Sequence, residues 1–148
     1  MSSGAYILLM QIDRSMRIDI GKLGNLRFSP GYYAYVGSAL GGLEKRIARH
    51  LRSNKKLHWH IDHLLVRARL IGAVYGFTKR RIECAIASYL KRRLAYTKNF
   101  GSSDCSCASH LFYSNDLDRL KNLALESFKS LGISPLFISS EGYNEGSN

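Results

Sequence analysis

The sequence predicts an α+β fold in which a small, mainly antiparallel three-stranded sheet is flanked by helices. First, short runs of β-forming and apolar residues occur at positions 5–11, 32–36 and 70–77. Second, the longer stretches between and after them carry apolar residues at the three- and four-residue spacing of amphipathic helices. Third, the chain has 148 residues, 45% of them hydrophobic and 22% charged, which is typical of one globular domain.

The N-terminal part is expected to hold three strands. The first covers residues 5–11, and a hairpin-like excursion at about residues 13–30 follows it, with alternating polar and apolar residues at 17–20. The turn Ser29-Pro30-Gly31 then leads into the strand at residues 32–36.

Helices and single strands alternate in the rest of the chain, which gives the order β, β, β, α, α, β, α, β, α. In the first helix, Leu43, Ile47 and Leu51 form an apolar stripe that Arg46 and His50 border. The helices are predicted at residues 43–52, 59–66, 81–94 and from a cap at 115 or 116 to the stop at Gly132, and the strands at residues 70–77 and 111–113.

The charge balance predicts a polyanionic partner. Lysine and arginine outnumber aspartate and glutamate by 22 to 11, which gives a formal net charge of +11. A general excess of basic residues without a specific purpose is the alternative. No apolar run reaches the ~18 residues needed to cross a bilayer, and the N-terminus lacks the features of a signal peptide. We therefore expect a cytoplasmic protein without a membrane partner.

Residues whose side chains could take part in catalysis follow one another in a characteristic order. Gly4-Ala5-Tyr6 opens the first strand, Tyr35-Val36-Gly37 ends a later one, Arg46 and His50 follow on a helix, and Glu83 begins the next long helix. This succession resembles the GIY-YIG nuclease superfamily over residues 4–95. It is most similar to a small archaeal and bacterial branch, classed as a domain of unknown function. The branch shares the runs Tyr-Val-Gly-Ser-Ala, His-Trp-His-Ile-Asp and Gly-Ser-Ser-Asp-Cys, which here begin at positions 35, 58 and 101.

The resemblance implies a catalytic role for each matching side chain. Tyr6 would position or deprotonate the attacking water, and Tyr35 would support the same network. Arg46 would contact the scissile phosphate and His50 would assist. Glu83 would be the single carboxylate that holds one divalent ion, Mg²⁺ or Mn²⁺, with no small-molecule cofactor. A fixed cation and an arginine suit phosphodiester hydrolysis because negative charge builds up on the phosphate oxygens.

The resemblance also has implications for the backbone and the domain plan. Gly37 would let the chain turn tightly into the site, and Gly4 would do the same at the first tripeptide. The long interval between the two tripeptides makes residues 13–30 an insertion that could cover the site. We expect one GIY-YIG-like domain over residues 1–140, with its core at about 4–95, a C-terminal strand–helix extension at about 96–140, and a flexible tail at 141–148.

Histidines and cysteines in the second half allow three interpretations. A polar cluster beside the active cleft is favoured, with His58 and His60 contacting phosphate. In the second interpretation these residues only cap helices and pack in the core, with Trp59 and Ile61 buried. Structural zinc is not expected, because Cys-x-Cys and His-x-His are not common zinc-ligand spacings. The residues weighed for zinc are His58, His60, Asp62, His63, Cys105, Cys107 and His110, whereas Cys84 lies in an apolar helical pattern and is expected to be a small core residue.

Three basic runs could follow a DNA backbone, although a solvated charged face is the alternative. They contain Lys45, Arg49, Arg52, Lys55 and Lys56, then Lys79, Arg80 and Arg81, then Lys91, Arg92 and Arg93. The function expected from all these features is metal-dependent endonuclease action on DNA. Fusion of some members of the branch to a base-excision repair enzyme suggests a role in DNA repair. The alternatives are an inactive nucleic-acid-binding module with the same fold and a nuclease directed at RNA.

Overall fold

The computed structural model describes residues 2–52, 55–103 and 105–142 and has an α+β fold built on a six-stranded antiparallel sheet. Strands β1 (Gly4–Ile12), β4 (Gly31–Ala39) and β5 (Arg69–Phe77) form its centre, in the order β4-β1-β5. These three strands were all predicted from the sequence. Their long apolar runs reflect burial on both faces, since eight of the nine residues of β1 are buried.

The prediction of a three-stranded sheet is wrong because the C-terminal half adds strands at both edges. Strand β7 (Leu111–Ser114) pairs with β4 and carries the two-residue strand β6 (Ala95–Tyr96), while β8 (Leu136–Ser139) pairs with β5. The complete order is β6-β7-β4-β1-β5-β8. The C-terminal extension therefore widens the sheet instead of only covering it.

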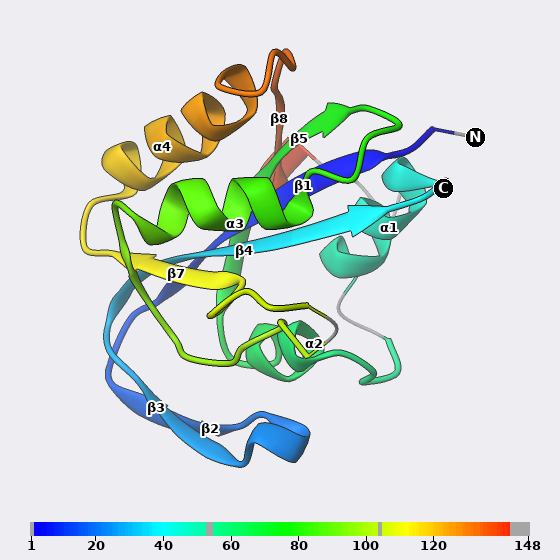
Figure 1. The fold of residues 1–148 in the computed structure, drawn as a ribbon. Helices are drawn as coiled ribbons and strands as arrows, with labels where there is room; N and C mark the ends of the chain where they lie inside the picture. Colours follow the sequence, from blue (N-terminus) through cyan, green and yellow to red (C-terminus); the bar gives the residue numbers. More distant parts are fainter. Residues whose placement is uncertain (1, 53–54, 104, 143–148) are drawn as a thin grey trace.

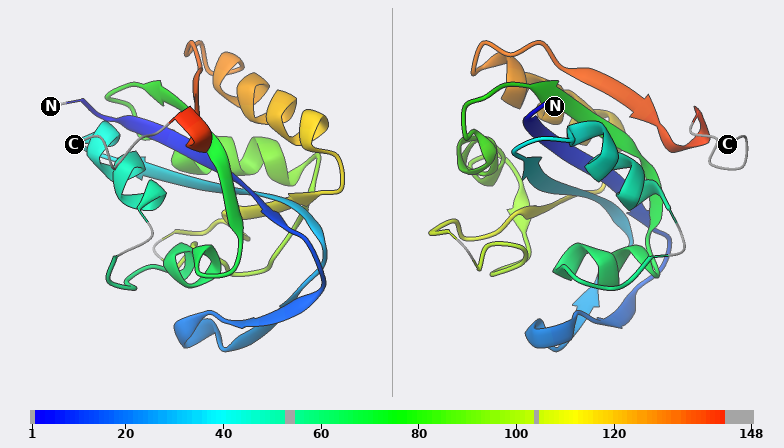
Figure 2. Two further views of the ribbon diagram at one scale, coloured as in Figure 1. Left: turned by 180° about the vertical axis from the view of Figure 1, so that it is seen from behind. Right: turned by 90° about the vertical axis from the view of Figure 1, so that its right-hand side faces the viewer.

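Helices cover both faces of the sheet (Figures 1 and 2). Helices α3 (Glu83–Lys91) and α4 (Leu117–Lys129) pack on one face, and the face's core includes Ile7 and Leu9 from β1. On the other face, even-numbered residues of β1 meet α1 (Leu43–Leu51) and α2 (His60–Leu65). Because successive side chains of a strand point to opposite faces of the sheet, β1 contributes residues to the hydrophobic cores on both faces.

The helix boundaries differ modestly from those expected. Helix α3 is shorter than the predicted range 81–94, although Ile82, Ile86 and Leu90 are buried as its apolar pattern indicates. Helix α4 begins as predicted after Asp116, whose carboxylate accepts a hydrogen bond from the backbone N–H of Arg119 at 3.3 Å.

The excursion between β1 and β4 forms a hairpin at the lower edge of the molecule in Figure 1. Strands β2 (Met16–Asp19) and β3 (Asn25–Phe28) pair with each other as a separate two-stranded sheet around a 3₁₀ turn at Gly21–Leu23. The hairpin packs against α2 and buries Ile18 and Phe28.

The C-terminal segment ends in a 3₁₀ turn at Ser140–Gly142, and the rest of the predicted tail, residues 143–148, lies outside the described residues. Within the described part of the chain, no helix combines the length and the apolar character that crossing a membrane requires.

Candidate active site

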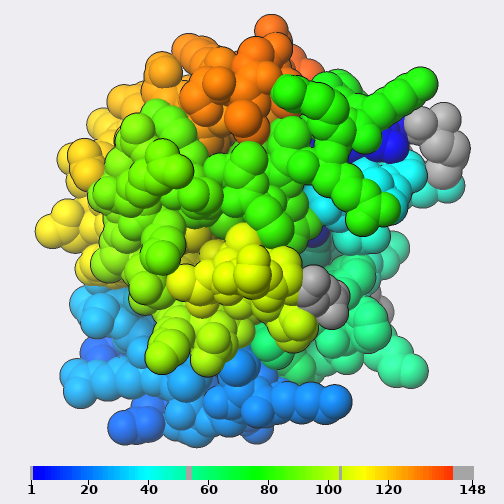
Figure 3. All heavy atoms as spheres, viewed as in Figure 1, coloured from blue at the N-terminus to red at the C-terminus, as the bar shows by residue number. Residues whose placement is uncertain are grey.

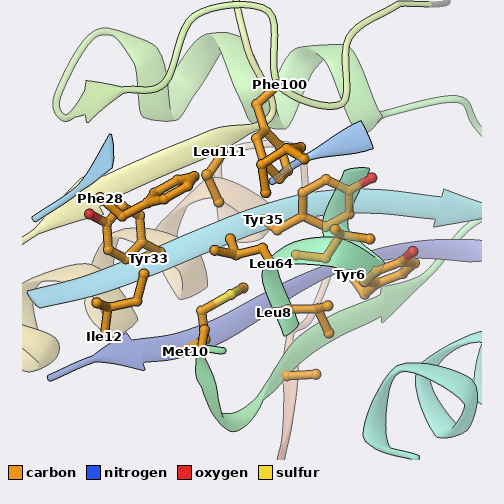
Figure 4. Close-up of a cluster of buried hydrophobic side chains, with 14 of the residues drawn as sticks. Tyr6, Leu8, Met10, Ile12, Phe28, Tyr33, Tyr35, Leu64, Phe100 and Leu111 are labelled. Atoms are coloured by element: carbon orange, nitrogen blue, oxygen red, sulfur yellow. The ribbon is translucent and has the colours of Figure 1, made fainter. Parts of the chain in front are cut away.

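Tyr6 on β1 and Tyr35 on β4 lie on the same face of the sheet. Tyr6 is paired with Gly37 and Tyr35 with Leu8, so the two tyrosines are diagonal neighbours across adjacent strands. Figure 4 shows both rings in the buried cluster, with the hydroxyl groups directed toward the same end of it. The convergence of the two phenols expected from the tripeptides is therefore present.

Gly37 and Gly4 do not turn the chain, contrary to the expectation. Gly37 lies within β4, and an added Cβ would be 2.4 Å from Cζ and the hydroxyl oxygen of Tyr6. An added Cβ at Gly4, the first residue of β1, would be 2.1 Å from the carbonyl oxygen of Gly76. Both positions require glycine because another group lies directly over the backbone, and at Gly37 that group is the Tyr6 ring.

The tyrosines open into a polar cavity of about 260 Å³. The cavity is surrounded by residues from β1, β4, α1, α2, α3 and the segment after β6. These residues span nearly a hundred positions of the sequence. The cavity is lined by Tyr6, Tyr35, Gly37, Ser38, Arg46, His58, Trp59, His60, Glu83, Gly101 and Ser103. Residues 13–30, which the structure describes in full, contribute nothing to this lining, so the hairpin does not cover the cavity.

His50 lies behind Tyr6, with its Nε2 atom 2.8 Å from the Tyr6 hydroxyl. Burial lowers the pKa of His50 to about 3, so its ring is neutral near pH 7. Burial also raises the pKa of Tyr6 well above its ordinary value, and the neighbouring Arg46 guanidinium offsets only part of that rise. Burial therefore favours the neutral forms of both Tyr6 and His50.

Arg46 is held rigidly at the cavity wall. Its Nη1 atom donates to the carbonyl oxygen of Ser38 at 3.0 Å, and its guanidinium lies 4.7 Å from the centre of the Trp59 ring. The guanidinium of Arg49 also lies against this ring, at 4.4 Å. Trp59 is thus partly exposed between two arginines and not fully buried as one of the alternatives assumed.

Glu83, the first residue of α3, places its carboxylate between two partners. Oε1 accepts a hydrogen bond from the Ser38 hydroxyl, and Oε2 lies 2.9 Å from Nδ1 of His110. The second contact has the distance of an ion pair but is not aligned as a hydrogen bond. Burial alone would raise the pKa of Glu83, but His110, Ser38 and Arg46 outweigh it and lower the pKa. The carboxylate is therefore ionised near neutral pH.

His60 lines the cavity, and one of its ring nitrogens has a backbone partner. Its Nδ1 atom accepts the backbone N–H of Gly101 at 3.0 Å, and burial lowers its pKa. In a neutral ring whose Nδ1 is an acceptor, Nε2 carries the hydrogen. His58 also lines the cavity, as predicted, and its ring packs edge-on against Trp59.

The basic residues predicted to bind DNA occupy different surroundings. Arg80 and Arg81 line a second hollow of about 290 Å³ that shares Ser38, Glu83 and Gly101 with the cavity. Lys45 and Lys56 are exposed, whereas Arg52 and Lys55 line a separate hollow beside His50 and Asp62.

Arg49 does not lie on a solvated charged face, the alternative that the sequence left open for its basic run. Its guanidinium binds both carboxylate oxygens of the buried Asp62, at 2.9 and 3.0 Å. Asp62 also accepts the backbone N–H groups of His58 and Trp59, so this pair fixes the start of α2 and the cavity wall there.

Of the histidines and cysteines weighed together in the sequence, all but His63 fall into two groups. His58 and His60 line the cavity, while Cys105, Cys107 and His110 gather with Cys84 at the N-terminal end of α3. The prediction that Cys84 is a core residue is wrong, because its side chain is exposed. Asp104, part of the Gly-Ser-Ser-Asp-Cys run, lies outside the described residues.

Several site residues carried no individual signal in the sequence. Ser38, Gly101 and Ser103 fall within runs shared with the branch, but their residue types are common in any loop. His110 precedes a strand and contacts Glu83 across 27 positions, so only the folded chain reveals the pair.

The fold and the cavity define a small α+β domain in which polar residues far apart in the sequence surround one cavity of about 260 Å³. The chain belongs to the family described as domain of unknown function DUF123, whose model matches residues 5–133. No curated protein and no solved structure matches the chain.

Proposed function

We propose that the protein is a metal-dependent endonuclease that hydrolyses DNA phosphodiester bonds. The observation that carries the proposal is that Tyr6, Tyr35, Arg46 and Glu83 line one cavity, with His50 bonded to Tyr6 behind it. The central strands β4-β1-β5, with α1 and α3 supplying the arginine and the glutamate, support the further proposal of a GIY-YIG core. The net charge of +11 favours a polyanionic substrate.

Glu83 fits a hard divalent ion. The carboxylate is ionised, its side chain is 30% exposed, and its contacts with Ser38 and His110 use about two of its roughly four lone-pair sites. Mg²⁺ or Mn²⁺ bound there would stabilise negative charge on the phosphate and lower the pKa of a water ligand.

The remaining steps belong to side chains of this chain. Arg46, held by Ser38 and Trp59, keeps N–H groups for a nonbridging phosphate oxygen, and the Nε2–H of His60 provides another donor. The Tyr6 hydroxyl can accept a proton from the attacking water while passing its own proton to Nε2 of His50. The protein's own groups make that transfer uphill, because burial raises the pKa of Tyr6 and lowers that of His50, so the transfer requires the charges of a substrate phosphate and a cation.

The test compares wild-type protein with Glu83→Gln on supercoiled, branched and single-stranded DNA and on RNA, with Mg²⁺, Mn²⁺ or a chelator. Glu126→Gln, an exposed carboxylate on α4, is the matched control. We expect metal-dependent nicking by wild type and the control, and none by Glu83→Gln. Salt-sensitive DNA binding without cleavage by any variant would identify a binding module instead, and cleavage of RNA alone would redirect the proposal to an RNA nuclease.

A further inference from the structure

Three thiols and one imidazole converge beside the candidate active site. Cys84 lies in the first turn of α3, Cys105 and Cys107 lie in the segment between β6 and β7, and His110 immediately precedes β7. We call these four residues the cysteine–histidine cluster. Their ligand atoms, one from each side chain, all lie within 4.8 Å of one another, and the cysteines are not joined by disulfides.

We propose that the cysteine–histidine cluster binds one structural zinc ion. A tetrahedral zinc ion with Zn–S bonds of about 2.3 Å and Zn–N bonds of about 2.0 Å separates sulfur from nitrogen by about 3.6 Å. The distance between Sγ of Cys105 and Nε2 of His110 is 3.5 Å. The cluster is thus already near ligand spacing, and three cysteines with one histidine complete a closed structural site.

The chemistry of the ligands separates this site from the one proposed at Glu83. Thiolates and imidazole bind zinc, whereas Mg²⁺ and Mn²⁺ prefer the oxygen atoms of carboxylates and water. The chain would therefore hold two different ions at two adjacent positions, a zinc ion at the cysteine–histidine cluster and a hard ion at Glu83.

The cluster joins a stretch of chain with little regular structure to a helix. Between β6 and β7 the described residues form turns, and in Figure 3 this yellow-green segment lies between α3 and the β2–β3 hairpin. Gly101 and Ser103, which line the cavity, come from the same segment. A metal ion bridging Cys84 to Cys105 and Cys107 would hold this wall of the cavity against α3.

His110 connects the two sites through its two ring nitrogens. Nε2 faces Cys105, and Nδ1 lies 2.9 Å from Oε2 of Glu83. A histidine that binds metal through one nitrogen commonly presents the other N–H to a carboxylate, which fixes both groups. Zinc at Nε2 would leave the hydrogen on Nδ1, on the side of the ring that lies beside Oε2 of Glu83. The zinc site itself is independent of nuclease activity, whereas any effect on catalysis rests on the proposed function.

The zinc content of the purified protein tests the proposal directly. Protein purified under reducing conditions should contain about one zinc per chain by mass spectrometry of the metal, and excess Mg²⁺ should not displace it. Replacement of zinc by Co²⁺ should produce the visible bands of tetrahedral cobalt and a thiolate-to-cobalt charge-transfer band. Wild-type protein with neither zinc nor these bands after incubation with the metals would overturn the proposal, as would a disulfide within the cluster under the same reducing conditions.

Variants locate the site. The double variant Cys84→Ser, Cys105→Ser should lower zinc content at least tenfold, while Ser106→Ala, an exposed change between two of the ligands, should retain it. Circular dichroism checks that the variants fold. If the double variant does not fold, Cys84→Ser alone should still weaken the charge-transfer band of the cobalt form, because one thiolate is lost. Full zinc retention by the folded double variant would reject the site.

The outcomes for zinc and for nuclease activity are distinguishable. Zinc content is measured without DNA or Mg²⁺, so an inactive protein with one zinc per chain would reject only the proposed function. An active protein without zinc would reject only the cysteine–histidine site.

Discussion

The hydroxyl of Tyr6 lies 2.8 Å from Nε2 of His50, and both side chains are 2% exposed. The other ring nitrogen of His50, Nδ1, has no hydrogen-bond partner among the described residues. A buried histidine with one unpaired nitrogen is costly to keep, so its contact with Tyr6 is the interaction that explains its position.

The first prediction concerns this contact. Tyr6→Phe removes only the hydroxyl and should reduce DNA cleavage by about 10²- to 10⁴-fold, the range typical of lost general acid–base catalysis. The ring continues to fill its place, but Nε2 of the buried His50 loses its partner, so the free energy of unfolding should fall by about 1–3 kcal/mol. Single-turnover cleavage and urea denaturation measure the two effects. Unchanged cleavage by Tyr6→Phe would show that the hydroxyl takes no part in the reaction.

The second prediction concerns stability in acid. Burial lowers the pKa of His50 to about 3, while Asp62 opposes this shift and the cations Arg49, Lys55 and Arg46 strengthen it. The unfolded chain takes up this proton below about pH 6.5, but the folded protein does not until about pH 3. The resulting stabilisation is complete above pH 6.5 and is lost as the pH falls toward 3, at up to about 1.4 kcal/mol per pH unit.

The comparison that isolates this effect is the free energy of unfolding of wild type and His50→Gln between pH 7 and pH 4. Glutamine does not titrate, so the variant should lose less stability over this interval than wild type. Parallel pH profiles for the two proteins would show that the pKa of His50 is the same in the folded and the unfolded protein, so that burial does not lower it.

The sequence predicted the structure correctly where a pattern of residues extends over a whole strand, a helix face or the order of the motifs. The apolar runs of β1 and β5 and the stripe from Leu43 to Ile47 predicted the central elements, and the order of the tripeptides predicted which side chains meet. Strands β6 and β8 escaped prediction because they are short and largely exposed, so they lack the buried apolar run of β7, and they form only by pairing with an existing edge.

For two individual side chains, Cys84 and Arg49, the surroundings in the folded chain differ from those that the sequence pattern suggested. Cys84 lies two residues after the buried Ile82, about 200° around the helix, and therefore faces away from the apolar stripe. Arg49 looked solvated on the helix surface, but Asp62 lies across a loop that no local rule positions. Both errors conceal functional geometry, because one residue belongs to the cysteine–histidine cluster and the other supports the cavity wall.

The third prediction tests that support. Asp62 is fully buried and binds Arg49 and two backbone N–H groups. Burial alone would raise its pKa, but these donors outweigh burial and lower it to about 2. Asp62→Asn leaves the arginine without its counterion and should destabilise the protein by about 3–5 kcal/mol.

Glu126→Gln is the control for this experiment, because Glu126 forms an ion pair with Lys129 in which both side chains are more than half exposed. Its loss should change the free energy of unfolding by less than about 1 kcal/mol in urea denaturation. Equal effects of the two substitutions would mean that the Arg49–Asp62 pair contributes no more than an ordinary surface pair.

The fourth prediction tests why Gly37 is glycine. The Cβ of Gly37→Ala would lie 2.4 Å from the Tyr6 ring, which is buried and cannot move aside freely, so overpacking should cost about 1–3 kcal/mol. Tyr6→Leu removes the ring, so in that background the same alanine should cost at least about 1 kcal/mol less. Urea denaturation of the two single variants, the double variant and wild type measures this difference. If alanine costs the same with and without the ring, the glycine serves the strand and not the tyrosine. A smaller cost without the ring means that the glycine of the second tripeptide holds the phenol of the first in place, although Tyr6 and Gly37 are 31 positions apart in the sequence.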